Sequence, residues 1–125
     1  MINLIDENLP MYTTEAEQSA TPELVEQVER LYNIVKISDN IQFFQPQYNG
    51  SLPPITLNFI AWVSRRNALS AVEGNWRDVF KEKSVHIYSY SAGTSANMVN
   101  HFSGLLEFFG AAKVKVTTTT NPEFV

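Results

Sequence analysis

Serine, threonine and glycine residues gather in the segment 89–95, directly after a run of alternating aliphatic and aromatic residues. Its first five residues, Ser-Tyr-Ser-Ala-Gly, are close to the G-x-S-x-G turn in which a serine attacks an ester or amide carbonyl. Ser91 would be that nucleophile. The chain order of such enzymes requires an acid and then a histidine downstream, but only His101, Glu107 and Glu123 follow. Because His101 falls on the helix expected directly after the turn, a helix cap is the better interpretation, and a small serine hydrolase is the weakest hypothesis.

The same segment could hold a phosphate, since Gly93, Thr94 and Ser95 would offer backbone amides at the start of a helix. However, the chain contains neither the P-loop nor the dinucleotide-binding motif, and the segment has no lysine. A metal site is equally disfavoured, because His86 and His101 have no carboxylates clustered with them and the chain has no cysteine. The sequence therefore predicts no catalytic residue, no metal ligand, no cofactor and no small-molecule ligand.

A strand, a helix and a second strand position this segment. Residues 84–90 alternate between two apolar faces, and the apolar residues of 96–109 repeat at spacings of three and four, as one face of a helix does. Gly110 suits the C-terminus of that helix. The alternation returns in 113–119, where two lysines alternate with two valines, a pattern typical of an edge strand. We expect the two strands to be parallel neighbours joined by the helix.

The preceding half of the chain predicts more helix and one more strand. Thr21 can cap a helix that Pro22 opens and that ends near Ile37. The segment Ile41–Gln45 is rich in β-branched and aromatic residues and favours a strand. Residues 46–54 contain an Asn-Gly pair and two adjacent prolines, which indicates irregular structure.

Two helices are expected between this irregular segment and the strand at 84–90. Residues 55–72 favour a helix that Gly74 ends, and Asn75 can cap a further short helix. The predicted fold class is therefore α/β, or α+β: a sheet of about three strands that contains one parallel β-α-β unit, with three to four helices packed on it. Residues 1–20 are expected to be a flexible N-terminal arm, in which Ile2–Ile5 could add a strand, and 21–125 a single globular domain.

The charge distribution leaves nucleic-acid binding open. The net charge is −4, but residues 1–54 carry eight acids against two bases, whereas the remainder is weakly basic. Tyr88, Tyr90 and His86 share one face of a strand, as stacking platforms for single-stranded RNA do, and Arg65 and Arg66 could contact phosphates. Against this, the whole chain is acidic and has no ribonucleoprotein motif, and a tyrosine face in an α/β sheet is expected to lie under a helix.

Protein binding is the favoured prediction, because aromatic residues make up 12% of the chain, more than one small sheet readily covers. The sequence indicates a non-enzymatic accessory, assembly or inhibitor factor of viral or phage type. It would act as a homodimer or within a larger complex, with RNA binding as the alternative. No leader or membrane span is apparent, which predicts a cytoplasmic protein without membrane contact. The candidate interface or nucleic-acid residues are Trp62, Arg65, Arg66, Tyr88 and Tyr90.

Overall fold

The computed structural model describes residues 1–90 and 96–119. Its backbone segments group into two compact units. The first, named here the helical unit, comprises Met1–Ile37 and Pro54–Val79; the second, the sheet unit, comprises Ser38–Pro53 and Phe80–Val125. The chain therefore visits each unit twice.

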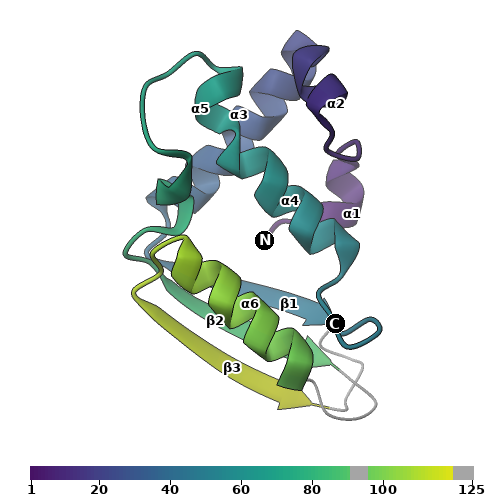
Figure 1. Cartoon of the computed structure of the whole chain (residues 1–125), viewed down its shortest axis with the longest axis vertical. Coiled ribbons are helices and arrows are strands. Elements are labelled where there is room, and N and C mark those ends of the chain that lie inside the picture. Colours follow the sequence, from purple (N-terminus) through teal and green to yellow (C-terminus); the bar gives the residue numbers. More distant parts are fainter. Residues whose placement is uncertain (91–95, 120–125) are drawn as a thin grey trace. The chain divides into compact units, whose positions relative to one another are not determined.

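The three strands of the sheet unit form one parallel sheet in the order β1, β2, β3. Strand β1 spans Asn40–Pro46, β2 spans Ser84–Tyr90 and β3 spans Lys113–Thr119. Helix α6, Ala96–Phe108, connects β2 to β3 and lies along one face of the sheet (Figure 1). The predicted α/β class, the parallel β-α-β unit, the third strand and the edge position of β3 within the described sheet are all confirmed.

The core of the sheet unit lies between α6 and the sheet. The side chains of Val85 and Ile87 in β2 are buried on this face. Phe43 of β1 meets Phe102 of α6 edge to face, with ring centroids 5.0 Å apart. Because α6 buries one apolar residue per turn, the sheet and the helix interlock along the whole helix. The remaining buried apolar side chains of this core include Phe80, Met98, Leu106 and Phe109.

The other face of the same sheet carries an aromatic row. The rings of Phe44 and Tyr88 stack with centroids 4.6 Å apart, and His86 stacks on Tyr88 at 3.9 Å. Sequence analysis favours a helix over this face, but α6 covers the opposite one. The reason is the alternation of β2, in which the aliphatic Val85 and Ile87 point toward α6 and the aromatic residues point away from it.

The helical unit is assembled from short helices around one long one. Helix α3 begins as predicted, because the hydroxyl of Thr21 accepts a hydrogen bond from the backbone N–H of Leu24 at 3.2 Å. Asn75 likewise caps the last element, with its side chain accepting from the N–H of Arg77 at 2.9 Å. The elements are α1 (Leu4–Glu7), α2 (Thr14–Gln18), α3 (Pro22–Ile37), α4 (Pro54–Ser64), α5 (Arg66–Leu69) and the 3-10 helix η1 (Trp76–Phe80), whose last residue belongs to the sheet unit.

Two local predictions are wrong in this unit. Ile2–Ile5 does not form a strand; instead the side chain of Asn3 caps α1 by accepting from the N–H of Ile5 at 3.0 Å. The helix expected over 55–72 is divided at Arg65, whose N–H bonds to the carbonyl oxygen of Trp62 at 3.0 Å. This tightened turn separates α4 from α5 and turns two consecutive arginines toward different carboxylates.

Residues 1–20 form α1 and α2 and belong to the helical unit. The side-chain amide of Gln27 donates to the carbonyl oxygen of Glu7 at 2.7 Å, which connects α1 to α3. The flexibility of this segment and a domain boundary at residue 20 stay predictions. Among the described residues, no helix combines the length and the apolar character that a bilayer crossing requires.

Candidate functional site

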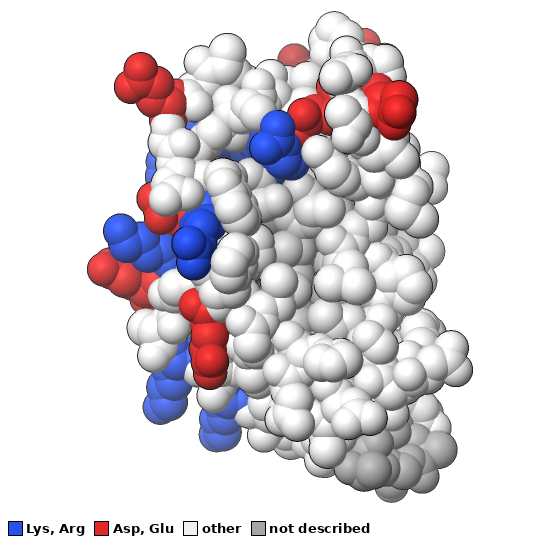
Figure 2. All heavy atoms as spheres, viewed as in Figure 1, with Lys and Arg blue, Asp and Glu red and all other residues white. Residues whose placement is uncertain are grey.

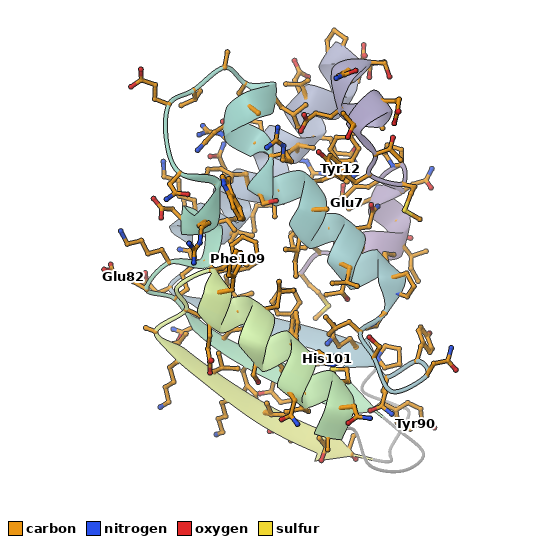
Figure 3. The ribbon with its side chains drawn as sticks, viewed as in Figure 1. Glu7, Tyr12, Glu82, Tyr90, His101 and Phe109 are labelled. Carbon is orange, nitrogen blue, oxygen red and sulfur yellow. The ribbon has the colours of Figure 1, made fainter. Side chains whose placement is uncertain are left out.

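The carboxyl ends of β1 and β2 form one edge of the sheet, the edge where open parallel sheets bind ligands. The backbone N–H of Gln47 donates to the carbonyl oxygen of Tyr90 at 3.0 Å, so the pairing of β1 with β2 extends one residue beyond Pro46. Figure 3 shows Tyr90 at this end of the sheet unit. The residues that leave the two strands are therefore held side by side.

A tight turn follows at once. Tyr48 and Ser51 exchange two backbone hydrogen bonds of 3.1 and 2.9 Å. Asn49 and Gly50 between them have φ angles of 51° and 70°, the left-handed values of a type I′ turn. Within the described residues, no hydrogen bond uses the backbone N–H of either. A Cβ atom on Gly50 would lie 3.6 Å from Nδ2 of Asn97, so the turn lies against the first residues of α6.

Two buried polar atoms at this edge lack partners. The side-chain oxygen Oε1 of Gln47 and the hydroxyl Oγ of Ser89 are buried and have no hydrogen-bond partner among the residues that the structure describes. Leaving such a group unpaired costs about 1–3 kcal/mol, so both atoms are expected to bind water or a ligand. The neighbouring Gln45 donates its side-chain amide to the sulfur of Met98 at 3.4 Å.

The side chains at this edge are uncharged. Gln45, Gln47 and Ser89 come from the strand ends, Tyr48 and Asn49 from the turn. The arrangement can therefore hold a neutral, planar, hydrogen-bonding group through amide and hydroxyl contacts, with backbone N–H groups of the turn as further donors. We define these residues together with Gly50 and Asn97 as the strand-end site.

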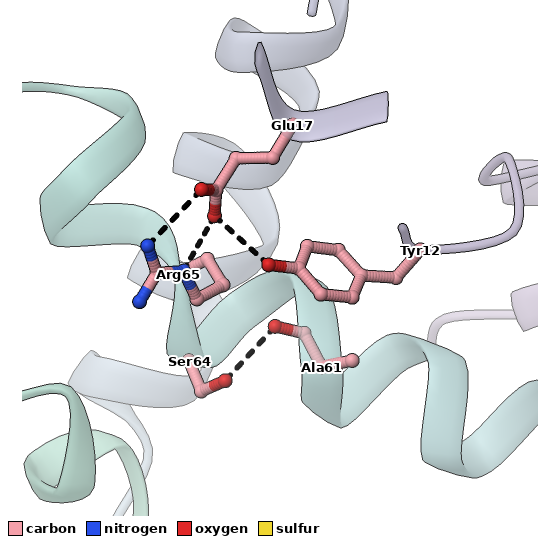
Figure 4. A network of polar contacts seen from close by, with 5 residues as sticks. All are labelled: Tyr12, Glu17, Ala61, Ser64 and Arg65. Carbon is pink, nitrogen blue, oxygen red and sulfur yellow. Dashed lines mark hydrogen bonds and ion pairs between the residues drawn. The ribbon is translucent and has the colours of Figure 1, made fainter. Parts of the chain in front are cut away.

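The residues that sequence analysis singles out lie elsewhere. Trp62 has no exposed surface, and its indole N–H donates to the carbonyl oxygen of Pro10 at 2.8 Å. Arg65 donates to both carboxylate oxygens of Glu17, with Nη2 3.0 Å from Oε2, and the hydroxyl of Tyr12 donates to the same carboxylate at 3.2 Å (Figure 4). The hydrogen bond from Arg65 holds the pKa of Glu17 below its usual value, although burial opposes it.

Arg66 has an equally complete set of contacts. Its guanidinium binds both carboxylate oxygens of Glu29 at 2.6 and 2.8 Å and lies 4.5 Å from the ring centre of Tyr32. The hydroxyl of Ser70 also donates to Glu29, at 3.1 Å. This pairing lowers the pKa of Glu29 and raises that of Arg66, with burial acting against both shifts. Both arginines thus have carboxylate partners inside the helical unit, which leaves them poorly placed to bind phosphate.

Tyr88 and Tyr90 belong to the sheet unit, whereas the arginines and Trp62 belong to the helical unit. A role of any of these five residues in a partner interface stays a prediction. Ser91, Gly93, Thr94 and Ser95 lie outside the described residues. Among the described residues, no group of three or more histidine, aspartate and glutamate side chains could hold a metal ion.

Sequence analysis missed the strand-end site. It treated 46–54 only as an irregular connection, although the Asn-Gly pair follows a strand by two residues. In a parallel sheet such a position is the carboxyl end, where ligands bind. The signal was therefore present, but it required the orientation of β1, which a five-residue apolar segment does not reveal.

Comparison with known proteins gives this edge a context. The family model described as NADPH-dependent FMN reductase matches residues 1–122. No curated protein matches the chain.

Three solved structures share its fold. One is FerB, a flavoenzyme NAD(P)H:(acceptor) oxidoreductase from Paracoccus denitrificans, with TM-score 0.61 and 23% identity over 92% of this chain and 55% of that one. The others are the azoreductase AzrA (TM-score 0.66, 16% identity, 94% of this chain and 67% of that one) and an azoreductase from Bacillus anthracis str. Sterne (TM-score 0.62, 16% identity, 94% and 66%). The chain thus spans about half to two-thirds of the length of these proteins, and the likeness identifies a flavodoxin-like fold.

The family match corrects the functional predictions. A non-enzymatic accessory, assembly or inhibitor factor of viral type is wrong, and so is the RNA-binding alternative, because the matched family consists of flavin reductases. The prediction that the chain takes no cofactor and no small-molecule ligand conflicts with the same match. The predicted homodimer is not tested.

Proposed function

This chain belongs to the NADPH-dependent FMN reductase family, and from this premise we propose that it binds FMN at the strand-end site as part of an NAD(P)H-dependent oxidoreductase. The observation that carries the proposal is the pair of unpartnered buried oxygens, Gln47 Oε1 and Ser89 Oγ, beside a turn with two unused backbone N–H groups. Since the chain spans only about half the length of FerB, the activity of the whole protein is part of the proposal.

The residues of the strand-end site fit a flavin ring. Such a ring is planar and presents one N–H donor and several acceptors along its edge. Gln47 Oε1 can accept from the N–H group, and the backbone N–H groups of Asn49 and Gly50 can donate to ring oxygens. The hydroxyl of Ser89 can do either. A neutral ring also suits the uncharged side chains that surround it.

The chemistry that bound FMN would supply is hydride transfer from a nicotinamide nucleotide to an electron acceptor. The contribution of this chain would be to orient the ring. The Gln47–Tyr90 backbone bond and the two Tyr48–Ser51 bonds fix the turn before any ligand arrives. Such preorganised donors lose little entropy on binding. The buried Leu52 and Pro53 directly after the turn keep its C-terminal side apolar and packed.

Flavin titration tests this proposal. FMN fluorescence is followed as protein is added, for the unchanged chain, Gln47→Leu and Ser89→Ala. Each variant should bind FMN about tenfold more weakly, the effect of losing one hydrogen bond of about 1.4 kcal/mol. Urea unfolding without flavin should show no loss of stability, because each substitution removes an unpartnered buried group. This combination separates a ligand-binding role from a structural one.

Matched controls are available in the same strands. Gln42→Leu changes the same side chain at an exposed position of β1, and Ser84→Ala changes a half-buried hydroxyl at the start of β2. Both should leave the affinity for FMN unchanged. Equal affinities of all five proteins would remove the strand-end site as the flavin site. Flavin-dependent oxidation of NADPH, measured for the same set, would then show whether the chain by itself supports turnover.

We also propose that the protein forms a homodimer, for which the exposed aromatic and apolar side chains provide the rationale. Phe44 and Tyr48 are examples in the sheet unit. Light scattering across a concentration series measures the mass directly. A monomer at all concentrations would contradict this part of the proposal and leave the flavin site untouched.

A further inference from the structure

The face of the sheet that points away from α6 is built as a connected aromatic row. Phe44 stacks on Tyr88 and Tyr88 on His86, with centroid distances of 4.6 and 3.9 Å. The ring of His86 continues the row to β3, because its Nε2 lies 2.8 Å from the hydroxyl oxygen of Thr117. The row thus crosses all three strands. Phe44 at its end is 46% exposed.

The same face carries positive charge and no described acid. The register pairs Lys115 with His86 and Lys113 with Ser84, so both lysines lie on the face of the aromatic row. Both are exposed, and neither makes an ion pair or a hydrogen bond with the residues that the structure describes. Gln42, Phe44 and Tyr90 complete the face with uncharged side chains. We call it the aromatic–lysine face.

Figure 2 shows that charged side chains are few over α6, on the visible side of the sheet unit. The two faces of the sheet therefore differ in kind. One is covered by an apolar helix through aliphatic side chains, and the other presents stacked rings bordered by lysines along β3. Strands of parallel sheets are normally covered on both faces, because helices pack there.

We propose that the aromatic–lysine face is a docking surface for an amphipathic α-helix of a partner protein, with an apolar stripe flanked by carboxylates. The stripe would pack on Phe44 and Tyr88, and the carboxylates would pair with Lys113 and Lys115. A helix fits better than an added strand, because the exposed feature is a sheet face rather than a backbone edge. The proposal is independent of the flavin site, whose Gln47 and Ser89 atoms lie at the carboxyl-end edge.

Two designed peptides test this proposal on the full chain. Both are 18-residue amphipathic helices with the same leucine stripe, one flanked by glutamates and the other by lysines, and each carries a fluorophore. Fluorescence anisotropy should show binding of the glutamate-flanked peptide only. The double variant Lys113→Glu with Lys115→Glu should bind it about fivefold to tenfold more weakly and should gain affinity for the lysine-flanked peptide. Phe44→Gln should weaken both interactions.

The control reverses two lysines outside this face. Lys36→Glu with Lys81→Glu makes the same change of net charge, with Lys36 in α3 and Lys81 ahead of β2. It should leave the preference for the glutamate-flanked peptide intact, and circular dichroism verifies folding of each variant. Equal binding of both peptides, no binding of either, or an equal loss in the control would overturn the proposal. Tighter binding of single-stranded oligonucleotides than of the glutamate-flanked peptide would overturn it as well.

Discussion

The backbone N–H of Gln47 and the carbonyl oxygen of Tyr90 are joined by a hydrogen bond of 3.0 Å, one residue beyond the end of β1. This bond fixes where the chain leaves β1 relative to the end of β2. Because the turn at 48–51 starts from Gln47, its donors are positioned by the sheet and not only by the turn's own geometry. The rigidity of the strand-end site is therefore a property of the parallel pairing.

The turn itself should be sensitive to its backbone angles. Gly50 has a φ of 70°, and a Cβ atom there would make only an ordinary contact with Asn97. Gly50→Ala should therefore cost about 1 kcal/mol through conformational strain rather than through a clash. Asn49→Gly, at φ 51°, should change the free energy of unfolding by less than about 0.5 kcal/mol. Urea unfolding measures both; equal stability of Gly50→Ala and the unchanged chain would contradict the assigned angles.

The arginines should differ in how well lysine replaces them. Arg66 binds Glu29 through two nitrogens, lies over Tyr32, and has a side chain only 14% exposed. Arg66→Lys should cost about 1–2 kcal/mol, because lysine cannot reproduce the planar, two-pronged contact. Arg30 reaches Glu7 through one nitrogen and is 53% exposed. Arg30→Lys should therefore cost less than about 0.5 kcal/mol. Similar losses in thermal unfolding would refute the distinction.

Sequence patterns located the sheet unit because its signals are local. The alternation in 84–90 and in 113–119 and the three–four spacing between them determine two parallel strands with one helix. The two lysines of β3 likewise indicated an edge strand correctly. The side of the sheet that α6 covers was missed, because the aliphatic and aromatic faces of β2 are both apolar enough to be buried.

The helical unit and the site depended on contacts that are distant in sequence. The break at Arg65 follows from its pairing with Glu17, 48 residues away. The cluster at the carboxyl ends depended on pairing β1 with β2, whose partners Phe44 and Tyr88 are far apart in the chain. The two orphan oxygens carry no sequence signal, since an unpaired glutamine or serine resembles any other. The cofactor therefore became apparent only from the family match.

Acid should weaken the fold through three carboxylates. Hydrogen bonds from Arg30, Arg65 and Arg66 lower the pKa values of Glu7, Glu17 and Glu29 below the usual value of 4.5. A lowered folded-state pKa contributes stability above the unfolded value and loses it as pH falls through the folded value. The free energy of unfolding should therefore decrease as the pH is lowered from about 5 to 3.

A variant isolates one of these carboxylates. Glu17→Gln should reduce the dependence of stability on pH over the same range, because it removes one group that must be protonated. Glu26→Gln is the matched control: it changes an exposed glutamate of α3 that makes no ion pair with the described residues. Urea unfolding at several pH values measures both. An unchanged slope for Glu17→Gln, or the same change for Glu26→Gln, would argue against the pairing with Arg65.

Trp62 should be the residue that holds the first 20 residues onto the helical unit. Its indole donates to the carbonyl oxygen of Pro10, and its ring meets Tyr12 edge to face at 5.0 Å. Trp62→Phe should cost about 2 kcal/mol, mainly through the cavity left by the smaller ring, because Asn58 also donates to Pro10 at 2.9 Å and keeps that oxygen paired. Hydrogen exchange of residues 11–18 should accelerate by a similar factor if their order depends on this contact.

The chain's other tryptophan provides the control, since Trp76 in η1 is 45% exposed while Trp62 is fully buried. Trp76→Phe should change the free energy of unfolding by less than about 0.5 kcal/mol and leave exchange at residues 11–18 as it was. The fluorescence of the remaining Trp62 should then resist quenching by acrylamide, whereas that of Trp76 alone should not. Equal destabilisation by the two substitutions, or exchange at residues 11–18 that ignores Trp62→Phe, would return this segment to the flexible arm that its sequence predicts.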